Sequence, residues 1–151
     1  MLWKREQILA QLHTVLQAVP GVAYVTRDRG ALGSDKRPAI QLLDGNEVAD
    51  RSQFDRGRSS SAPNYIWISP GIYVTMENKL PDNIGIGTDL NVFCAAIIKA
   101  VAFSAELKAL VAREDGIRYD GLITDFEEDL TCSGKARVGI SFLYYLSPDE
   151  L

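Results

Sequence analysis

YIWISPGIYVTME, residues 65–77, alternates between two kinds of side chain. Aliphatic residues at every second position are interleaved with Tyr65, Trp67, Tyr73 and other aromatic or polar residues. A period of two places the two sets on opposite faces of an extended chain, so this stretch predicts a long, half-buried β-strand. Pro70-Gly71 in its middle predicts an edge position, a bulge or a break into two strands, because proline has no N–H to donate to a neighbouring strand.

Shorter strand patterns lie on both sides of this stretch. Three are rich in β-branched and aromatic residues: 22–26, 117–126 and 136–146. A fourth pattern, with 39–43 and 47–48 flanking Asp44-Gly45-Asn46, predicts a hairpin turn, because glycine accepts a positive φ without a Cβ clash. We therefore expect a β-ribbon at 39–48.

Helical patterns separate these strands. Residues 3–19 carry apolar side chains at three- and four-residue steps, which predicts a helix with one buried stripe. Thr88 and Asp89 are suited to cap a second helix whose interior is apolar on most sides, and Ser104 restarts the pattern through Val111. The order of elements predicts an α+β fold: a mainly antiparallel sheet of about four to six strands, including the ribbon, with two main helices packed on one face.

Length and composition are those of one globular domain. The chain has 151 residues, 46% of them hydrophobic and 24% charged, and a net charge of -4. We expect a single domain over 1–151 with a mobile loop at about 50–64, where Ser, Arg, Gly and Asp prevail. The N-terminus has no signal-peptide pattern and no stretch is apolar enough to span a bilayer, so we expect a soluble, non-membrane protein with Cys94 and Cys132 reduced.

Residue patterns typical of enzymes are incomplete. His13 is the only histidine, and no GxSxG turn accompanies it. Residues 85–89, GIGTD, lack the third glycine and the lysine of phosphate-binding loops. We therefore expect no enzyme, no catalytic, metal or cofactor site and no cofactor. One alternative stays open: a small ligand- or metal-binding enzyme that uses the carboxylates of Asp125 and Glu128, which lie in an acidic run at a strand end.

Two arginine-bearing loops and one aromatic strand face are the candidate interaction residues. The set comprises Arg27, Arg29, Lys36 and Arg37 in the first loop, Arg51, Arg56 and Arg58 in the second, and Tyr65, Trp67 and Tyr73 on the strand. Arginine binds phosphate and carboxylate groups, and tyrosine and tryptophan are enriched at protein interfaces. The loops also hold aspartates, so solvated loops, a helix covering the aromatic face, or a nucleic-acid-binding regulator stay open as alternatives.

The order of short phrases along the chain resembles the tail terminator family of long-tailed bacteriophages, also called tail completion or minor tail protein U-like. The resemblance lies in GVAYVTRDRG (21–30), RPAIQLLDGNEVAD (37–50), a Ser/Arg loop, IWISPGIYVTM (66–76) and IRYDGLITDFEE (117–128). It implies a small α+β subunit that forms a hexameric ring on the tail tube, ends tube polymerisation and offers a surface for head-tail joining. The implied partners are other copies of the chain, the tail tube protein and the head-tail connector, with DNA passing through the ring lumen. The implied location is the bacterial host cytoplasm during assembly and then the virion tail.

Overall fold

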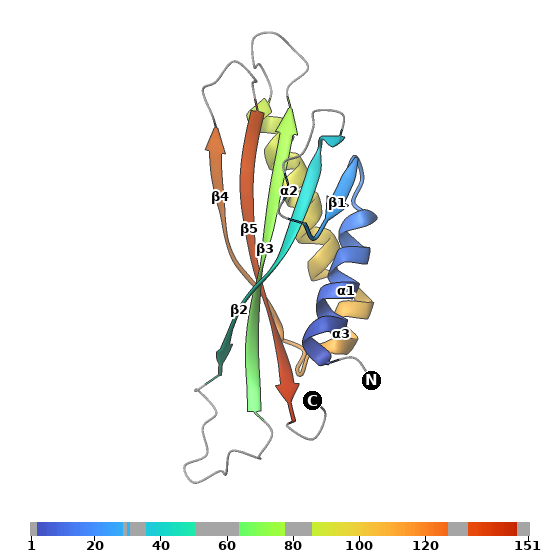
Figure 1. Cartoon of the computed structure of the whole chain (residues 1–151), viewed down its shortest axis with the longest axis vertical. Helices are drawn as coiled ribbons and strands as arrows, with labels where there is room; N and C mark the ends of the chain where they lie inside the picture. Colours follow the sequence, from blue (N-terminus) through green and yellow to red (C-terminus); the bar gives the residue numbers. More distant parts are fainter. Residues whose placement is uncertain are drawn as a thin grey trace.

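A five-stranded sheet is the centre of the computed structural model, which describes residues 3–28, 30, 36–50, 64–77, 86–126 and 133–147. The strands lie in the order β1-β2-β3-β5-β4, as Figure 1 shows from right to left at its upper end. Their bounds are β1 Tyr24–Thr26, β2 Ala39–Ala49, β3 Asn64–Glu77, β4 Ile117–Phe126 and β5 Ser133–Leu146. The helices are α1 Lys4–Gln17, α2 Ile86–Ala102 and α3 Ala105–Leu110. The predicted α+β class is confirmed.

Strand β3 is the middle strand of the sheet and pairs antiparallel with both β2 and β5. Its aliphatic residues, among them Ile68 and Ile72, are fully buried, while Tyr73 on the opposite face is exposed. The predicted alternation is therefore confirmed. The edge position suggested by Pro70 is wrong, and so is the break, because β3 runs without interruption through Pro70 between two neighbours.

Strand β2 contains the bulge that accompanies Pro70. The register of β2 against β3 shifts between Leu43 and Asn46, opposite this proline. Gly45 has φ +71 there, and a Cβ at this position would lie 1.9 Å from the carbonyl oxygen of Ser69. The predicted hairpin turn and β-ribbon at 39–48 are wrong, because these residues form a bulge within one strand. A glycine with positive φ fits such a bulge as well as it fits a hairpin turn.

The remaining pairings make the sheet mixed. β1 is parallel to β2 over three residues, whereas β3 with β5 and β4 with β5 are antiparallel. The prediction of a mainly antiparallel sheet is therefore confirmed, and the short edge strand β1 is its parallel exception.

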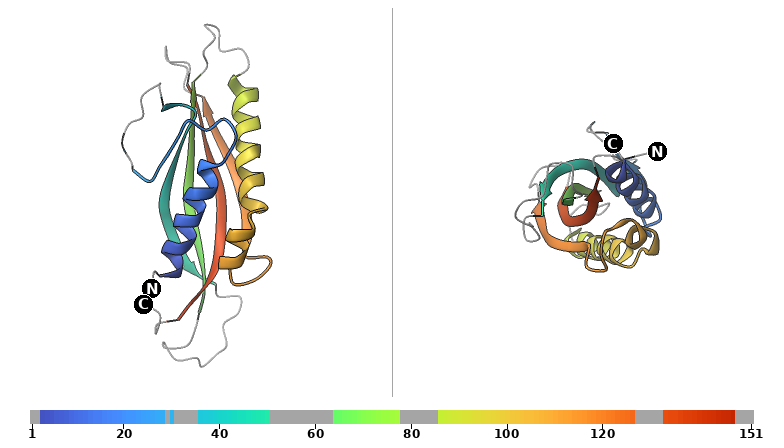
Figure 2. Two further views of the ribbon diagram at one scale, coloured as in Figure 1. Left: turned by 90° about the vertical axis from the view of Figure 1, so that its right-hand side faces the viewer. Right: turned by 90° about the horizontal axis from the view of Figure 1, so that it is seen from below.

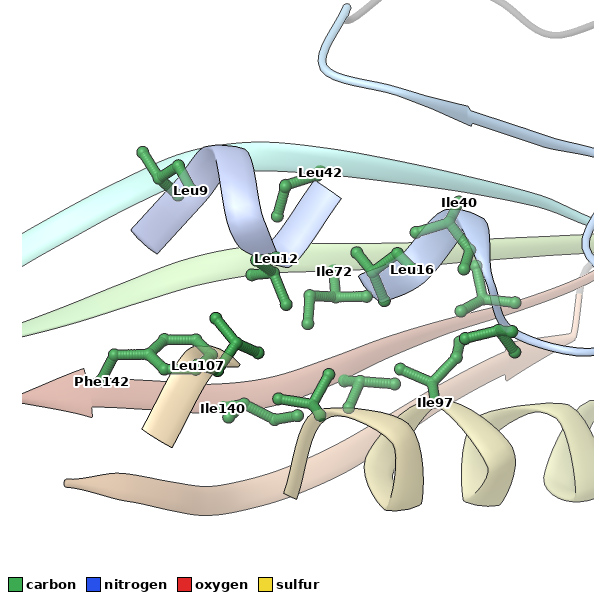
Figure 3. Close-up of a cluster of buried hydrophobic side chains, with 14 of the residues drawn as sticks. Leu9, Leu12, Leu16, Ile40, Leu42, Ile72, Ile97, Leu107, Ile140 and Phe142 are labelled. Carbon is green, nitrogen blue, oxygen red and sulfur yellow. The ribbon is translucent and has the colours of Figure 1, made fainter. Parts of the chain in front are cut away.

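Side chains from all three helices and from the sheet form one hydrophobic core. Figure 3 shows Leu12 and Leu16 of α1, Ile97 of α2 and Leu107 of α3 directed toward the sheet, where they meet a set of buried residues that includes Ile40, Leu42, Ile72, Ile140 and Phe142. The helices lie in front of the sheet in the left view of Figure 2. The opposite face of the sheet, called the outer face below, bears Tyr65, Trp67 and Tyr73 of β3 together with Arg137 of β5, which is opposite Tyr73.

Several predicted boundaries move by a few residues. α2 begins at Ile86, so Thr88 and Asp89 lie inside its first turn rather than at its cap. Ser104 does cap α3, since its hydroxyl accepts a bond from the N–H of Leu107. The proposed loop at 50–64 is ordered at both ends: the N–H of Asp50 donates to the carbonyl of Tyr65, and Asn64 begins β3. Residues 51–63 lie outside the described part of the chain. Within the described helices, none is long and apolar enough to cross a bilayer.

Candidate interaction surface

Each of the three predicted aromatic residues on the outer face is covered by an arginine. The guanidinium carbon of Arg118 lies 4.4 Å from the ring centre of Trp67, and that of Arg137 lies 5.6 Å from Tyr73. Arg113 lies 5.2 Å from the ring centre of Tyr65. Stacking of this kind contributes about 0.5–1 kcal/mol at exposed sites. The arginines therefore hold the rings in place along β3.

These arginines come from three separate parts of the chain. Arg137 is the direct cross-strand neighbour of Tyr73 on β5. Arg118 lies on the edge strand β4, and Arg113 lies in the segment between α3 and β4. Arg113 also forms ion pairs with Asp50 at 3.7 Å and with Asp115 at 3.3 Å. The segment before β4 is thereby joined to the end of β2.

A second aromatic contact extends the surface onto β5. Tyr65 and Tyr145 face each other across the β3–β5 pair, with ring centres 4.1 Å apart and planes inclined by 42°. The hydroxyl of Tyr145 donates to that of Tyr65. Tilted ring pairs are favourable beyond the area that they bury. Rings stacked by arginines thus line the outer face, and we call this set the aromatic–arginine patch (Tyr65, Trp67, Tyr73, Tyr145, Arg113, Arg118 and Arg137).

A depression of about 340 Å³ interrupts the outer face beside this patch. We call it the hollow; its lining includes Ser69, Pro70, Asp120, Ile123, Arg137 and Ile140. Glycines at 121 and 139 also line it, and they face each other across β4 and β5. Because these two glycines have no side chains, they leave space between the aromatic side chains of the outer face.

Asp120 is the acidic group in the wall of the hollow, and Arg137 is the basic one. Its carboxylate accepts from Nε of Arg118 at 2.7 Å and from the hydroxyl of the buried Ser141. Ser141 is also hydrogen-bonded to Ser69 on β3, with the two oxygens 2.8 Å apart. The β4 bulge between Tyr119 and Gly121 turns Asp120 toward these serines. Each carboxylate oxygen retains capacity to accept another donor.

Arg27, the first predicted interaction residue, is an internal ion-pair partner. It donates to both carboxylate oxygens of Glu6 on α1, at 2.6 and 3.2 Å, and to Asp44 on β2 at 2.7 Å. Donation to Glu6, and secondarily to Asp44, raises the pKa of the Arg27 guanidinium above its ordinary value. This residue joins α1 to the sheet, and its contact with a partner stays a prediction.

A neighbouring network covers the edge of β2 at the bulge. Arg5 donates to the carbonyl of Gly45 at 3.0 Å and forms an ion pair with Glu47 at 2.9 Å. Glu47 in turn accepts from the hydroxyl of Tyr144 on β5. Burial, and then this bond to Glu47, raises the pKa of Tyr144.

The other predicted cationic residues are dispersed. Lys36 is exposed and lies 4.7 Å from the ring centre of Tyr24, while Arg37 is half-buried. Neither belongs to the aromatic–arginine patch. Four further predicted residues lie outside the described part of the chain: Arg29, Arg51, Arg56 and Arg58.

Arg113, Arg118, Arg137 and Asp120 were not among the interaction residues predicted from the sequence. A signal was present for three of them. Arg137 stands between apolar neighbours in a strand pattern, and the motif Arg118-Tyr119-Asp120 places two opposite charges on one face of a strand. No local signal identifies Arg113, because its ring partner is distant in sequence.

The described residues contain no group of three His, Cys, Asp or Glu side chains able to hold a metal ion. Cys94 is buried, and this burial raises the pKa of its thiol to about 11, which makes it a poor nucleophile at neutral pH. Asp125 lies in β4, but its side chain falls outside the described part, as does Glu128. The carboxylate alternative therefore stays untested.

Comparisons with known protein families and with curated proteins give no match for this chain.

Proposed function

We propose that this chain is a structural protein of a bacteriophage or prophage tail, one that caps the tail tube as a ring, ends tube polymerisation and provides the head-tail joining surface. The observation that carries the proposal is the aromatic–arginine patch. It supports a role in assembly, and the resemblance described above supplies the kind of assembly. Its partners in this proposal are other copies of the chain, the tail tube protein and the head-tail connector, with DNA in the ring lumen.

The composition of the patch is that of a protein interface. Tryptophan, tyrosine and arginine are the residue types that most often dominate binding energy at such interfaces. Here Arg118 covers Trp67 and Arg137 covers Tyr73, so that the side chains are ordered before any partner arrives. Pre-ordered side chains lose less conformational entropy on binding, which favours association.

A ring requires two different surfaces on each subunit that fit one another. The aromatic–arginine patch is one such surface, on the side of the sheet opposite the core. The helix layer is the other candidate, since Val92 and Phe103 are exposed there. Two different surfaces on different sides of one subunit allow head-to-tail contacts between copies that close into a ring.

The decisive experiment is electron microscopy of tails assembled with and without this protein. We expect tails of abnormal or uncontrolled length in its absence, and normal tails when the wild-type chain is supplied in trans. The matched pair Trp67→Ala and Tyr24→Ala then separates the patch from general damage: the first should fail to restore tail length and the second should restore it. Tails of normal length without the protein would exclude the proposed role.

A further inference from the structure

Strand β4 is the outermost strand of the sheet, and β5 pairs with it on one side only (Figure 1). Its other side presents main-chain N–H and C=O groups that no strand of the described residues pairs with. Proteins usually protect such an edge with a proline, a lysine or a bulge. β4 has a bulge between Tyr119 and Gly121, but residues 121–124, GLIT, contain neither a charge nor a proline. This part of β4 is therefore open to an added strand.

Strand β2 has a second free edge, on the opposite side of the sheet. β1 pairs with β2 only over residues 39–41. Arg5 covers the next part of this edge, since it donates to the carbonyls of Asp44 and Gly45. Residues 46–49 follow, and all four are exposed while β3 pairs with their other side. Each side of the sheet thus ends in a stretch of strand that lacks a neighbour among the described residues.

Each of these two edges carries an exposed aliphatic side chain on the outer face. Val48 of β2 is 64% exposed and Ile123 of β4 is 65% exposed. Val48 is paired with Trp67, and Ile123 is paired with Arg137, so both side chains lie on the side of the sheet away from the core. An apolar side chain at a strand edge becomes buried when another strand is added beside it, which favours the addition.

The directions of the strands allow the two edges to meet. β2 with β3, β3 with β5 and β5 with β4 are all antiparallel, so β2 and β4 run in opposite directions. A second copy can be placed beside the first by a rotation that keeps the outer faces on the same side. β4 of the first copy then lies antiparallel to β2 of the second, which continues the alternation of the sheet.

We propose that β4 of one copy of this chain pairs, antiparallel and through main-chain hydrogen bonds, with residues 46–49 of β2 in a second copy. The inference rests on the proposed self-assembly and names the contact between copies. The occupant of the β4 edge is an extended strand, because the unpaired N–H and C=O groups of an edge bind an extended backbone.

The choice of β2 as the occupant follows from the second free edge. Pairing of β4 with β2 uses both edges of every copy, whereas pairing of β4 with β4 would leave β2 open. Because the two edges differ, the contact is head-to-tail and can close into a ring. The aromatic–arginine patch then remains available for the tail tube protein or the connector.

Hydrogen exchange of the full wild-type chain tests this contact. Exchange is compared at a concentration where sedimentation shows single copies and at one where it shows assemblies. We expect amides of β4 and of residues 46–49 to exchange at least about tenfold more slowly in the assembly, while those of α2 and α3 keep their rates. Slower exchange in β4 alone would indicate β4–β4 pairing, and slower exchange confined to the helices would indicate a helix contact. Either result would overturn the inference, as would a chain that remains a single copy at every concentration.

Three lysine variants provide a second test, because a lysine at a strand edge opposes the addition of a strand. Ile123→Lys and Val48→Lys should each weaken self-association at least about tenfold in sedimentation. The control is Val92→Lys on α2, which is as exposed as Val48 and should associate like the wild type. Thermal unfolding of all three variants should match that of the wild-type chain, because all three side chains are exposed.

The outcomes separate this inference from the proposed function. If either strand variant associates like the wild type, or if only Val92→Lys weakens association, the inference fails and a ring formed through another surface stands. Tail length in the electron microscope judges the proposed function independently. Tails of normal length without the protein would exclude that function even if β4 and β2 pair between copies.

Discussion

The two faces of β3 differ in what their side chains contact and therefore in what they contribute. On the inner face, aliphatic residues such as Ile68 and Ile72 are fully buried against all three helices. On the outer face, Trp67 is stacked by Arg118 and Tyr73 by Arg137, both arginines of the same sheet. Burial of apolar area stabilises the fold, whereas half-exposed rings stacked by arginines add little to it.

We therefore expect the inner face to determine the stability of the subunit and the outer face to determine its association with partners. A substitution on the inner face should unfold the protein before it affects any contact. A substitution on the outer face should leave the subunit folded and change what it binds. The four predictions that follow test that separation.

Ile72 and Ile123 provide the sharpest contrast, because the same residue type occurs on both faces. Ile72 is 0% exposed and Ile123 is 65% exposed. We expect Ile72→Ala to lower the free energy of unfolding by about 3 kcal/mol, through lost burial and the cavity left behind. Ile123→Ala should stay within about 0.5 kcal/mol of the wild-type value. Denaturant unfolding of both variants measures this, and equal losses would contradict the assignment of the two faces.

The β2 bulge is the next largest expected effect. Gly45→Ala places a Cβ against the backbone of Ser69 and requires an alanine at φ +71, so we expect a loss of about 2 kcal/mol. Gly21→Ala is the matched control, since Gly21 also has a positive φ but no atom within 4 Å of a Cβ. The control should lose only about 1 kcal/mol. A Gly45 variant no less stable than the control would argue against a close contact between the bulge and β3.

Sequence patterns predicted the features that depend on neighbouring residues. The period of two in 65–77 assigned each side chain of β3 to its face, and Ser104 was recognised as a helix cap. The bounds of β4 were also predicted, from a run of β-branched and aromatic residues. In each case the physical cause lies within a few positions of the residue itself.

Features that depend on distant residues were not predicted. Asp44-Gly45 was interpreted as a turn because its conformation suits both a turn and a bulge, and only the pairing of β2 with β3 on both sides of Pro70 distinguishes them. The ion pair of Arg27 with Glu6, 21 positions away, was not predicted either. The arginine stacks on the outer face likewise join segments far apart in sequence.

The pH dependence of stability tests burial at Cys94 in the helix layer. Its thiol ionises near pH 9 in the unfolded chain but has a pKa of about 11 in the folded protein. The unfolded state therefore loses its proton first, and wild-type stability falls as the pH rises from about 9 to about 11. Cys94→Ala should be less stable than the wild type at pH 7, and that gap should narrow by about 2 kcal/mol across the window. Unfolding measured at half-unit pH steps checks this; a constant gap would contradict a buried, protonated thiol.

The smallest expected effect comes from the stacking of Arg118 on Trp67, a contact typical of the outer face. A double-mutant cycle with Arg118→Ala and Trp67→Leu isolates the pair, because each single change removes the stack while the double change removes both partners. We expect a coupling energy of about 0.5 kcal/mol in unfolding, the lower end for an exposed cation–π pair. Arg118 also donates to Asp120, so Asp120→Asn serves as the control for that bond. A coupling near zero in unfolding, together with lost association in both single variants, would mean that the stack orders the patch for a partner without stabilising the fold.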